Sequence, residues 1–399
     1  MSERLPEGWK WVRLGEVCEK ITDGTHHTPH YVKEGIPFLS VKNVRETGLD
    51  FENVQYIREE EHKELIKRCY PQRGDVLYTK VGTTGIAKAV DTDREFSIFV
   101  SVALLRPERT KIIPEYLEKV LNSPICKEQA KALTQGVGNQ NLVIKDLKQI
   151  EFPLPPLPEQ KRIATKLREL MQEVERARTA CEKQLEAVKA LPSAYLREVF
   201  ESEEAKKWER KRLGEVCKTT SGGTPHRGHI EYFYGNIPWV KSGELKDGYI
   251  NDTEEKITKL GLDNSNAKVL PTGTLLIAMY GATVGKLGIL EIAAATNQAI
   301  CAILPNSNVL TDFLFFFFLY YRKDLINKSY GGAQPNISQE LIRKTLIPMP
   351  AINDQHRIAT YLNEKMAYVE KLKVSIEKQL EAINALPQAI LRKAFRGEL

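Results

Sequence analysis

The chain has 399 residues, a length that suits two domains or two repeats better than a single hydrophobic core. Hydrophobic residues make up 42% and charged residues 28%, which is the balance of a folded protein and excludes a largely disordered one. The net charge of +6 is compatible with a polyanionic partner but does not identify one, and six cysteines without a C-x-x-C pair favour neither a zinc ribbon nor a disulfide framework.

A membrane protein is not expected. The N-terminal sequence MSERLPEGWKW lacks the apolar region of a signal peptide. The most apolar run, 313–321, is far shorter than the roughly 20 residues that span a bilayer, so it predicts a buried helix. Free cysteines suit a reducing compartment, and we expect a cytoplasmic protein.

The first 155 residues predict an α+β domain, with β-rich runs at 75–79 and 96–105 and a helix near 115–121. The turn Lys80-Val-Gly-Thr-Thr-Gly85 follows a strand, and the side chains of Lys80, Thr83 and Thr84 are candidate contacts to DNA phosphates. Lys42 and Asn43 are further candidates for contact with DNA.

The first domain contains two other polar loops. His26, His27 and His30 suggest a metal site, but without a carboxylate or cysteine at ligand spacing an exposed loop or a DNA contact is the better interpretation. The segment 135–141 mixes glycine with amides, and amides bond bidentately to adenine in the major groove. Its candidates are Gln135, Asn139, Gln140 and Asn141. A polar turn that ends the domain explains each single residue equally well.

From Pro158 the chain predicts a long amphipathic helix, because Ile163, Leu167, Leu170 and Val174 recur at spacings of three and four. We expect this helix to end near Pro192, because proline disrupts helix interiors.

The second half repeats the first. Arg13-Leu-Gly-Glu-Val-Cys18 returns as Arg212-Leu-Gly-Glu-Val-Cys217, and Gln160-Lys-Arg-Ile-Ala-Thr165 returns as Gln355-His-Arg-Ile-Ala-Thr360. The helical parts are nearly identical, whereas the globular parts share only glycine, proline and apolar positions. Near-identical segments suit two copies of one partner, and divergent segments suit two different ligands.

Loops of the second half supply corresponding candidates for DNA contact, namely Lys241, Ser242, Tyr280, Thr283, Lys286, Gln334 and Asn336. The sequence Tyr280-Gly-Ala-Thr-Val-Gly-Lys286 is not a Walker A loop, because one residue is missing between its glycines and Leu287 occupies the hydroxyl position. His226 and His229 lie in a loop that corresponds to the first histidine loop.

The second helix carries Ile358, Leu362, Val369, Ile376 and Leu380 at nearly heptad spacing and reaches Pro387. Such narrow stripes predict that the two long helices pair, although each helix could instead pack on its own globular half. No methyltransferase tetrapeptide, H-E-x-x-H, G-x-S-x-G or G-x-G-x-x-G motif occurs, so we expect no catalysis by this chain.

The repeat, the helices and the segments Phe152-Pro-Leu-Pro-Pro-Leu-Pro-Glu-Gln-Lys-Arg-Ile-Ala164 and Gly222-Gly-Thr-Pro225 together resemble the specificity subunits of type I restriction-modification systems, which defend against foreign DNA. The resemblance covers the whole chain. It implies an α+β pseudo-two-fold repeat of two tandem target-recognition domains, each followed by a long helix, with the two helices pairing as an antiparallel coiled coil.

By this resemblance, residues 1–155 and 201–350 are target-recognition domains, and 156–200 and 351–399 are conserved helical regions. The second helical region departs from the first, with Ala351 for Pro156 and Asn353 for Pro158. The helical stripes named above would form the coiled coil and dock two methyltransferase subunits, with restriction and translocase subunits in the full complex.

The resemblance further implies an asymmetric bipartite site in double-stranded DNA, with S-adenosylmethionine, ATP and Mg²⁺ bound by the partner subunits and no cofactor in this chain. Two other hypotheses stay open: a helical adaptor that binds only protein, and a non-catalytic DNA-binding part of another defence system.

Overall fold

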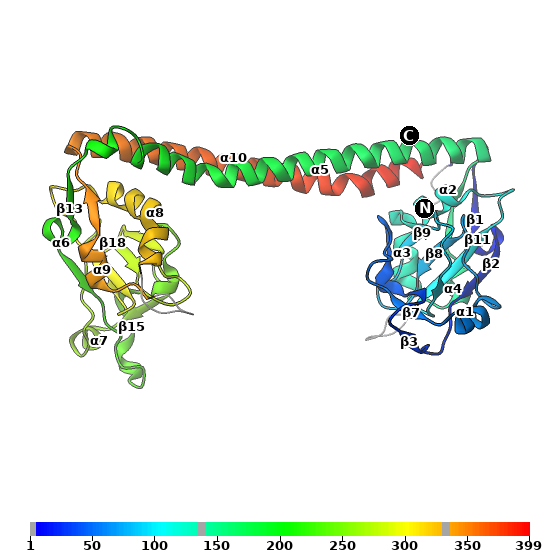
Figure 1. Cartoon of the computed structure of the whole chain (residues 1–399), viewed down its shortest axis with the longest axis horizontal. Helices are drawn as coiled ribbons and strands as arrows, with labels where there is room; N and C mark the ends of the chain where they lie inside the picture. The colour runs from blue at the N-terminus through cyan, green and yellow to red at the C-terminus, as the bar shows by residue number, and fades with distance from the viewer. Residues whose placement is uncertain (1–4, 135–140, 329–335) are drawn as a thin grey trace. The chain divides into compact units, whose positions relative to one another are not determined.

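The computed structural model describes residues 5–134, 141–328 and 336–399. The chain forms two compact units, one comprising Met1–Glu182 with Lys378–Leu399 and the other Lys183–Glu377. Each long helix therefore contributes residues to both units (Figure 1). The four-part division expected from the sequence stays a prediction.

The globular part of unit 1 is built around two four-stranded sheets in the described residues. The first has the order β2 (Cys18–Asp23), β11 (Val102–Pro107), β8 (Val76–Thr79), β9 (Ala87–Ala89) and is antiparallel throughout. The second has the order β10 (Ser97–Ile98), β4 (Ile36–Leu39), β7 (Gln55–Ile57), β3 (Tyr31–Val32), and its β10–β4 pair is parallel. The helices and short strand pairs are α1 (Glu59–Ile66), α2 (Pro114–Leu121), α3 (Pro124–Leu133), α4 (Ile144–Leu147), β1 (Lys10–Arg13) with β12 (Glu151–Leu154), and β5 (Val44–Arg45) with β6 (Gly48–Leu49).

Unit 2 repeats this plan with a five-stranded and a three-stranded sheet in the described residues. The larger has the order β14 (Thr219–Ser221), β21 (Ile300–Ile303), β18 (Leu275–Ala278), β19 (Leu287–Leu290), β16 (Gly248–Ile250). The smaller has the order β17 (Glu255–Ile257), β15 (Phe233–Val240), β20 (Ala295–Thr296). The remaining elements are β13 (Arg210–Arg212) with β22 (Leu346–Pro348), α6 (Leu213–Val216), α7 (Lys259–Asp263), α8 (Thr311–Asn327) and α9 (Gln339–Lys344).

Helix α8 contains the apolar run, and its residues 313–318 are buried in the core of unit 2, as the sequence predicts. Across the described residues, no helix combines the length and apolar character that crossing a bilayer requires. The run is apolar on most sides because the sheet, the end of one long helix and the start of the other surround it within this unit.

The two long helices are α5 (Leu157–Phe200) and α10 (Ile352–Ala394). The expected helix ends at Pro192 and Pro387 are wrong, because both helices continue through these prolines. Residues after each proline are anchored by burial: Phe200 lies in the core of unit 2 and Phe395, just beyond α10, in the core of unit 1. This burial offsets the roughly 3 kcal/mol cost of an internal proline.

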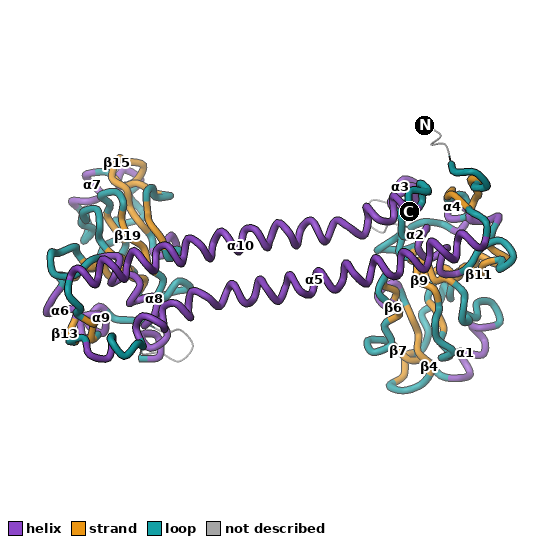
Figure 2. Tube along the Cα trace, turned by 90° about the horizontal axis from the view of Figure 1, so that it is seen from above, coloured by secondary structure: helices purple, strands orange, loops and turns teal. Residues whose placement is uncertain are grey.

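Helix segments pair antiparallel within each unit, as the family resemblance implies. In unit 1, Arg162 donates to the backbone oxygen of Leu399 at 2.6 Å, and Cys181 Sγ lies 3.9 Å from Gln379 Oε1. Residue numbers thus rise on one segment while they fall on the other. Figure 2 shows the two long helices as purple tubes labelled α5 and α10. In unit 2, Tyr361 donates to Glu198 and Arg357 pairs with Glu204, with the same opposite order.

The apolar stripe is buried in the core of a unit where each long helix begins. Ile163 and Leu167 are buried in the core of unit 1, and Ile358 and Leu362 in the core of unit 2. The same cores contain residues of the opposite long helix, Leu391 and Ala394 in unit 1 and Leu196 and Phe200 in unit 2. The four stripe side chains therefore pack with the other helix as well as with their own globular parts, and their role in docking a partner stays a prediction. Farther along, Leu170, Val174 and Leu380 are half-buried, and Val369 and Ile376 are buried.

A repeated glutamine fixes the start of each helix. The amide of Gln160 accepts from the Ile113 N–H at 3.0 Å and donates to the backbone oxygens of Lys111 and Pro155. Gln355 makes the equivalent bonds to Leu310, Asn308 and Pro350. The repeated Gln-x-Arg-Ile-Ala motif therefore includes a buried clamp between helix and globular part.

Candidate nucleic-acid interface

Loops from several strands of unit 1 converge on the turn at 99–101. The N–H of Phe99 donates to Leu39 O at 2.9 Å, and the N–H of Lys80 donates to Ser101 O at 2.9 Å. The N–H of Val100 donates to Thr25 O at 2.9 Å. We call the joined segments 24–27, 39–43, 80–85, 99–101 and residue 141 turn cluster 1. It gathers loops that follow β2, β4 and β8, which is why residues far apart in sequence meet there.

Unit 2 builds the same cluster around the turn at 297–299. The N–H of Asn297 donates to Val240 O at 3.0 Å, and the N–H of Met279 donates to Ala299 O at 2.8 Å. The N–H of Gly223 donates to Thr296 O at 2.9 Å, as Thr25 does to Ile98 O in unit 1. We call the segments 222–224, 240–244, 279–285, 296–299 and residue 336 turn cluster 2.

Each cluster depends on one glycine that lies against a backbone carbonyl. A Cβ atom on Gly24 would stand 1.9 Å from the oxygen of Ile98, and one on Gly222 would stand 2.0 Å from the oxygen of Thr296. Real Cβ atoms do not approach so closely. Gly222, the first glycine of the Gly222-Gly-Thr-Pro225 motif, is therefore required for the packing of turn cluster 2.

The candidate DNA contacts of unit 1 include both exposed and buried side chains. Thr83 is exposed, Thr84 is half-exposed and Lys42 is exposed, so these can contact a ligand. Asn43 is buried and its amide bonds to Ser40 and to the backbone oxygen of Asn53, which argues against its role in base contact. Lys80 is also buried, with its Nζ 3.3 Å from a carboxylate oxygen of Asp23. Both side chains stabilise the loops from inside.

In unit 2, Tyr280 and Asn336 are exposed, and Ser242 and Thr283 are half-exposed. Lys241 forms ion pairs with Glu254 and Glu255 at 2.9 and 3.0 Å, and Lys286 pairs with Asp247 at 2.6 Å. These lysines keep partial exposure, but their charges are largely compensated within the chain.

Gln135, Asn139, Gln140 and Gln334 lie outside the described residues, whereas Asn141 forms an isolated β-bridge with Val81 in turn cluster 1. Across the parts that the structure describes, no group of three or more His, Cys, Asp or Glu side chains is arranged to hold a metal ion. His26 instead lies 3.3 Å from Asp23, and His229 lies 2.9 Å from Glu231.

Asp247 binds residues at the end of the turn 280–286 in unit 2. Its carboxylate accepts from the Leu287 N–H at 3.0 Å and pairs with Lys286 and with Arg322, which also donates to Gly285 O. Burial raises the pKa of Asp247, but the Lys286 hydrogen bond and the Arg322 charge outweigh burial and lower this pKa below its ordinary 3.8. The carboxylate is therefore charged at neutral pH.

We expect Asp247→Asn to destabilise the loops around Leu287 by about 2 kcal/mol at pH 7, because charged hydrogen bonds are lost. Since the folded pKa is lowered, the wild-type contribution is present above pH 3.8 and is lost as the pH falls through the folded pKa. The difference in Leu287 amide exchange between wild type and variant should accordingly shrink on acidification. A difference that is independent of pH would contradict this role.

Residues that the sequence interpretation missed lie on the central turns. Phe99, Val100 and Ser101 form the turn of unit 1, and Asn297, Gln298 and Ala299 form that of unit 2. The polar Thr296-Asn297-Gln298 run directly before a buried strand is the one sequence signal that points to this place.

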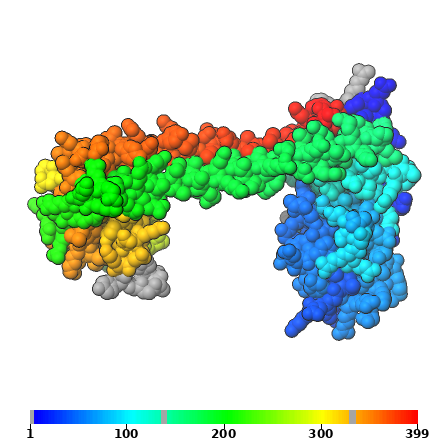
Figure 3. All heavy atoms as spheres, turned by 45° about the horizontal axis from the view of Figure 1, so that its top comes forward, coloured from blue at the N-terminus to red at the C-terminus, as the bar shows by residue number. Residues whose placement is uncertain are grey.

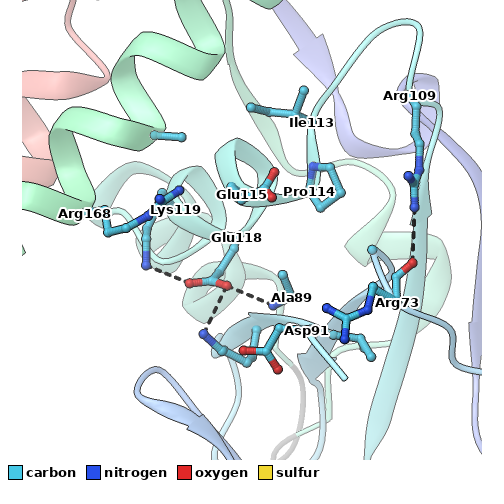
Figure 4. A pocket seen from close by; sticks show the side chains of 14 residues that line it. Arg73, Ala89, Asp91, Arg109, Ile113, Pro114, Glu115, Glu118, Lys119 and Arg168 are labelled. Carbon is cyan, nitrogen blue, oxygen red and sulfur yellow. Dashed lines mark hydrogen bonds and ion pairs between the residues drawn. The ribbon is translucent and has the colours of Figure 1, made fainter. Parts of the chain in front are cut away.

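A cavity of about 720 Å³ in unit 1 lies at the opposite end of β8, next to Gly74 and the start of α2 (Figure 4). Glu118 at its wall accepts from Lys119 at 2.7 Å and from the Ala89 N–H at 2.9 Å, with Lys88 at 3.4 Å. These donors belong to the chain itself, so the arrangement is that of a structural ion cluster. It shares no residue with turn cluster 1.

Comparisons with known proteins identify the family to which the chain belongs. The family model described as type I restriction modification DNA specificity domain matches residues 6–186 and again 205–382. The chain belongs to this family of type I specificity subunits, whose task is DNA sequence recognition.

Among the relatives, the putative type I restriction enzyme MjaX specificity subunit of Methanocaldococcus jannaschii is 24% identical over 99% of this chain and 94% of its own. The EcoKI specificity subunit of Escherichia coli is 23% identical over 99% and 90%. The crystal structure of the HsdS subunit from Thermoanaerobacter tengcongensis has a TM-score of 0.69 at 23% identity, covering 100% of this chain and 99% of that one. These likenesses agree with the fold described above.

Proposed function

We propose that this chain reads an asymmetric DNA site in two parts, one with each turn cluster, and leaves catalysis to partner subunits. The observation that carries the proposal is the pair of clusters, which share backbone hydrogen bonds but differ in side chains. Phe99 corresponds to Asn297, Val100 to Gln298 and Lys80 to Met279 through these matched bonds. Unlike side chains on one scaffold suit two different base sequences.

The protonation of the buried cysteines and the pairing of the ionic side chains support a chain that does not catalyse a reaction itself. Burial raises the pKa of Cys69, Cys126 and Cys301 to about 12 in each case, so these thiols stay protonated and are poor nucleophiles. The ionic groups described above are compensated within the chain. S-adenosylmethionine, ATP and Mg²⁺ would then be bound by the partners.

Docking of two methyltransferase subunits is the second part of the proposal, with restriction and translocase subunits joining the full complex. It is supported by the repeated helical sequences, whose charged faces are exposed beyond the buried stripe. Two equivalent surfaces on one chain suit two copies of one partner. Mass measurement of the purified complex should give two methyltransferase subunits per chain, and an active one-to-one complex would contradict this stoichiometry.

A domain exchange tests the two-part reading. Residues 1–155 would be replaced by the corresponding part of a family member of different specificity, and methylated sites in genomic DNA would then be sequenced. We expect one half of the recognised site to change while the other half is kept. The reciprocal exchange of 201–350 is the matched control and should change the other half. A change in both halves after a single exchange would contradict the proposal.

The salt dependence of DNA binding distinguishes a DNA reader from an adaptor that binds only protein. A DNA reader with several phosphate contacts should lose affinity steeply between about 50 and 200 mM salt, because condensed counterions are released on binding. Binding of the purified complex to a duplex that carries the methylated sequence measures this. No binding at low salt would favour the adaptor.

A further inference from the structure

The central turn of turn cluster 2 carries an exposed glutamine whose orientation is fixed from a distant loop. The hydroxyl of Thr224 donates to Gln298 Oε1 across a sequence separation of 74 residues. In the described residues the Nε2 group of Gln298 has no hydrogen-bond partner, and the side chain is exposed. An exposed glutamine ordinarily samples many rotamers, so this bond holds the amide ready for a ligand.

The backbone beneath Gln298 is fixed as well. The Ile300 N–H donates to Asn297 O at 3.3 Å, which closes the turn, and the Asn297 N–H is bonded to Val240 O. The Thr224 loop is held by the Gly223 N–H, which donates to Thr296 O, and by Trp239 Nε1, which donates to Gly223 O at 3.0 Å. Trp239 is buried, so the backbone on both sides of the Thr224–Gln298 hydrogen bond is held in place by packed or hydrogen-bonded residues.

The first unit lacks this pair at the same place. The closed turn there has Val102 N–H donating to Phe99 O, which puts Val100 at the position of Gln298. His26 occupies the position of Thr224, and its ring lies against Asp23. An apolar side chain in one cluster therefore replaces an oriented amide in the other.

We propose that Gln298 reads an adenine in the half-site bound by unit 2 and that Thr224 is its positioning residue. This rests on the proposed function. The amide can accept from the adenine N6 amino group through the second lone pair of Oε1 while Nε2 donates to N7, which is the bidentate pattern that distinguishes adenine in the major groove. Val100 at the matched position offers only an apolar contact, such as one with the thymine methyl group.

The chemistry of the glutamine gives a sharp test. Gln298→Glu keeps the shape but has only acceptors at neutral pH, so it repels adenine N7 and favours the amino group of cytosine N4. With the methyltransferase subunits bound, wild type should prefer A·T at one base pair of the second half-site by about 5- to 100-fold in affinity. In the Gln298→Glu complex this preference should disappear or shift to C·G, and Gln298→Ala should remove it without a new preference.

Thr224 is tested by two further variants. Thr224→Val removes the hydroxyl and should reduce adenine preference at the same base pair, whereas Thr224→Ser should retain it. A merely structural role would instead weaken binding to all sequences alike. The first half-site, measured on the same complexes, is the internal control and should not change.

The measurement is competition binding on duplexes that vary one base pair at a time, after sequencing of methylated DNA has defined the wild-type site. Unchanged preferences at every base pair of the second half-site in both Gln298 variants would overturn the assignment. So would a change in the first half-site. If the domain exchange alters one half-site while the Gln298 variants do not, the assignment fails and the two-part function stands; if one exchange changes both halves, the proposed function itself fails.

Discussion

Phe395→Ala is expected to destabilise unit 1 by about 3–5 kcal/mol, although this residue is only four positions from the end of the chain. Its side chain is 1% exposed and meets the ring of Tyr116 edge-on, with centroids 5.5 Å apart. The cavity left by a phenylalanine in such a core loses both transfer energy and packing contacts. The residues that follow Phe395 lie at the surface beside the N-terminal residues of the same unit (Figure 3), where Gly397 approaches Pro6.

Phe200→Ala should have the corresponding effect on unit 2. Phe200 contacts the rings of Phe313 and Phe317 at 5.7 Å each. Because two units need not unfold together, hydrogen exchange is the suitable measurement, with α2 reporting on unit 1 and α8 on unit 2. Leu386→Ala, at a position of α10 that is 42% exposed, is the control and should change little. If Phe395→Ala accelerated exchange equally in α2 and α8, the separate anchoring of the two units would be wrong.

The long helices and the repeat could be predicted because both depend on patterns within short stretches of sequence. The apolar spacing from Ile163 to Val174 specifies a helical face, and the repeated segments specify duplication. The helix ends could not be predicted, since Pro192 and Pro387 give a strong local stop signal. Tertiary burial of Phe200 and Phe395 overrides that signal, and nothing in the flanking sequence reports it.

The candidate site was predicted less well, for a related reason. Glycine and amide loops identified the right segments, but the state of each side chain depends on partners far away in sequence. Lys80 resembles a phosphate contact until Asp23 is found beside it, and Lys286 does so until Asp247 is found. Conversely, Gln298 looks like an ordinary strand-edge residue until Thr224 is placed against it. Charge and hydrogen-bond pairing of this kind is a property of the fold.

Gly222→Ala is expected to abolish reading of the second half-site while leaving the first intact, and Gly24→Ala should do the reverse. The added methyl group would stand 2.0 Å from Thr296 O in one case and 1.9 Å from Ile98 O in the other, so the central turn must move. Side chains that read bases need their geometry held closely, and a displaced turn loses the contacts made by a whole half-site. We expect at least a ten-fold loss of discrimination, since each mismatched base pair is worth about 1–3 kcal/mol.

Gly248→Ala is the matched control for this experiment, because Gly248 lies in β16 of unit 2, outside turn cluster 2, and a Cβ there meets no atom within 4 Å. Gly48→Ala serves the same purpose in unit 1. Affinities of the methyltransferase complex would be compared for the intact site and for duplexes with one half-site scrambled. For Gly222→Ala, scrambling the second half-site should no longer matter, whereas scrambling the first should still weaken binding. Equal loss of discrimination at both half-sites in Gly222→Ala would show that the two clusters do not read separately.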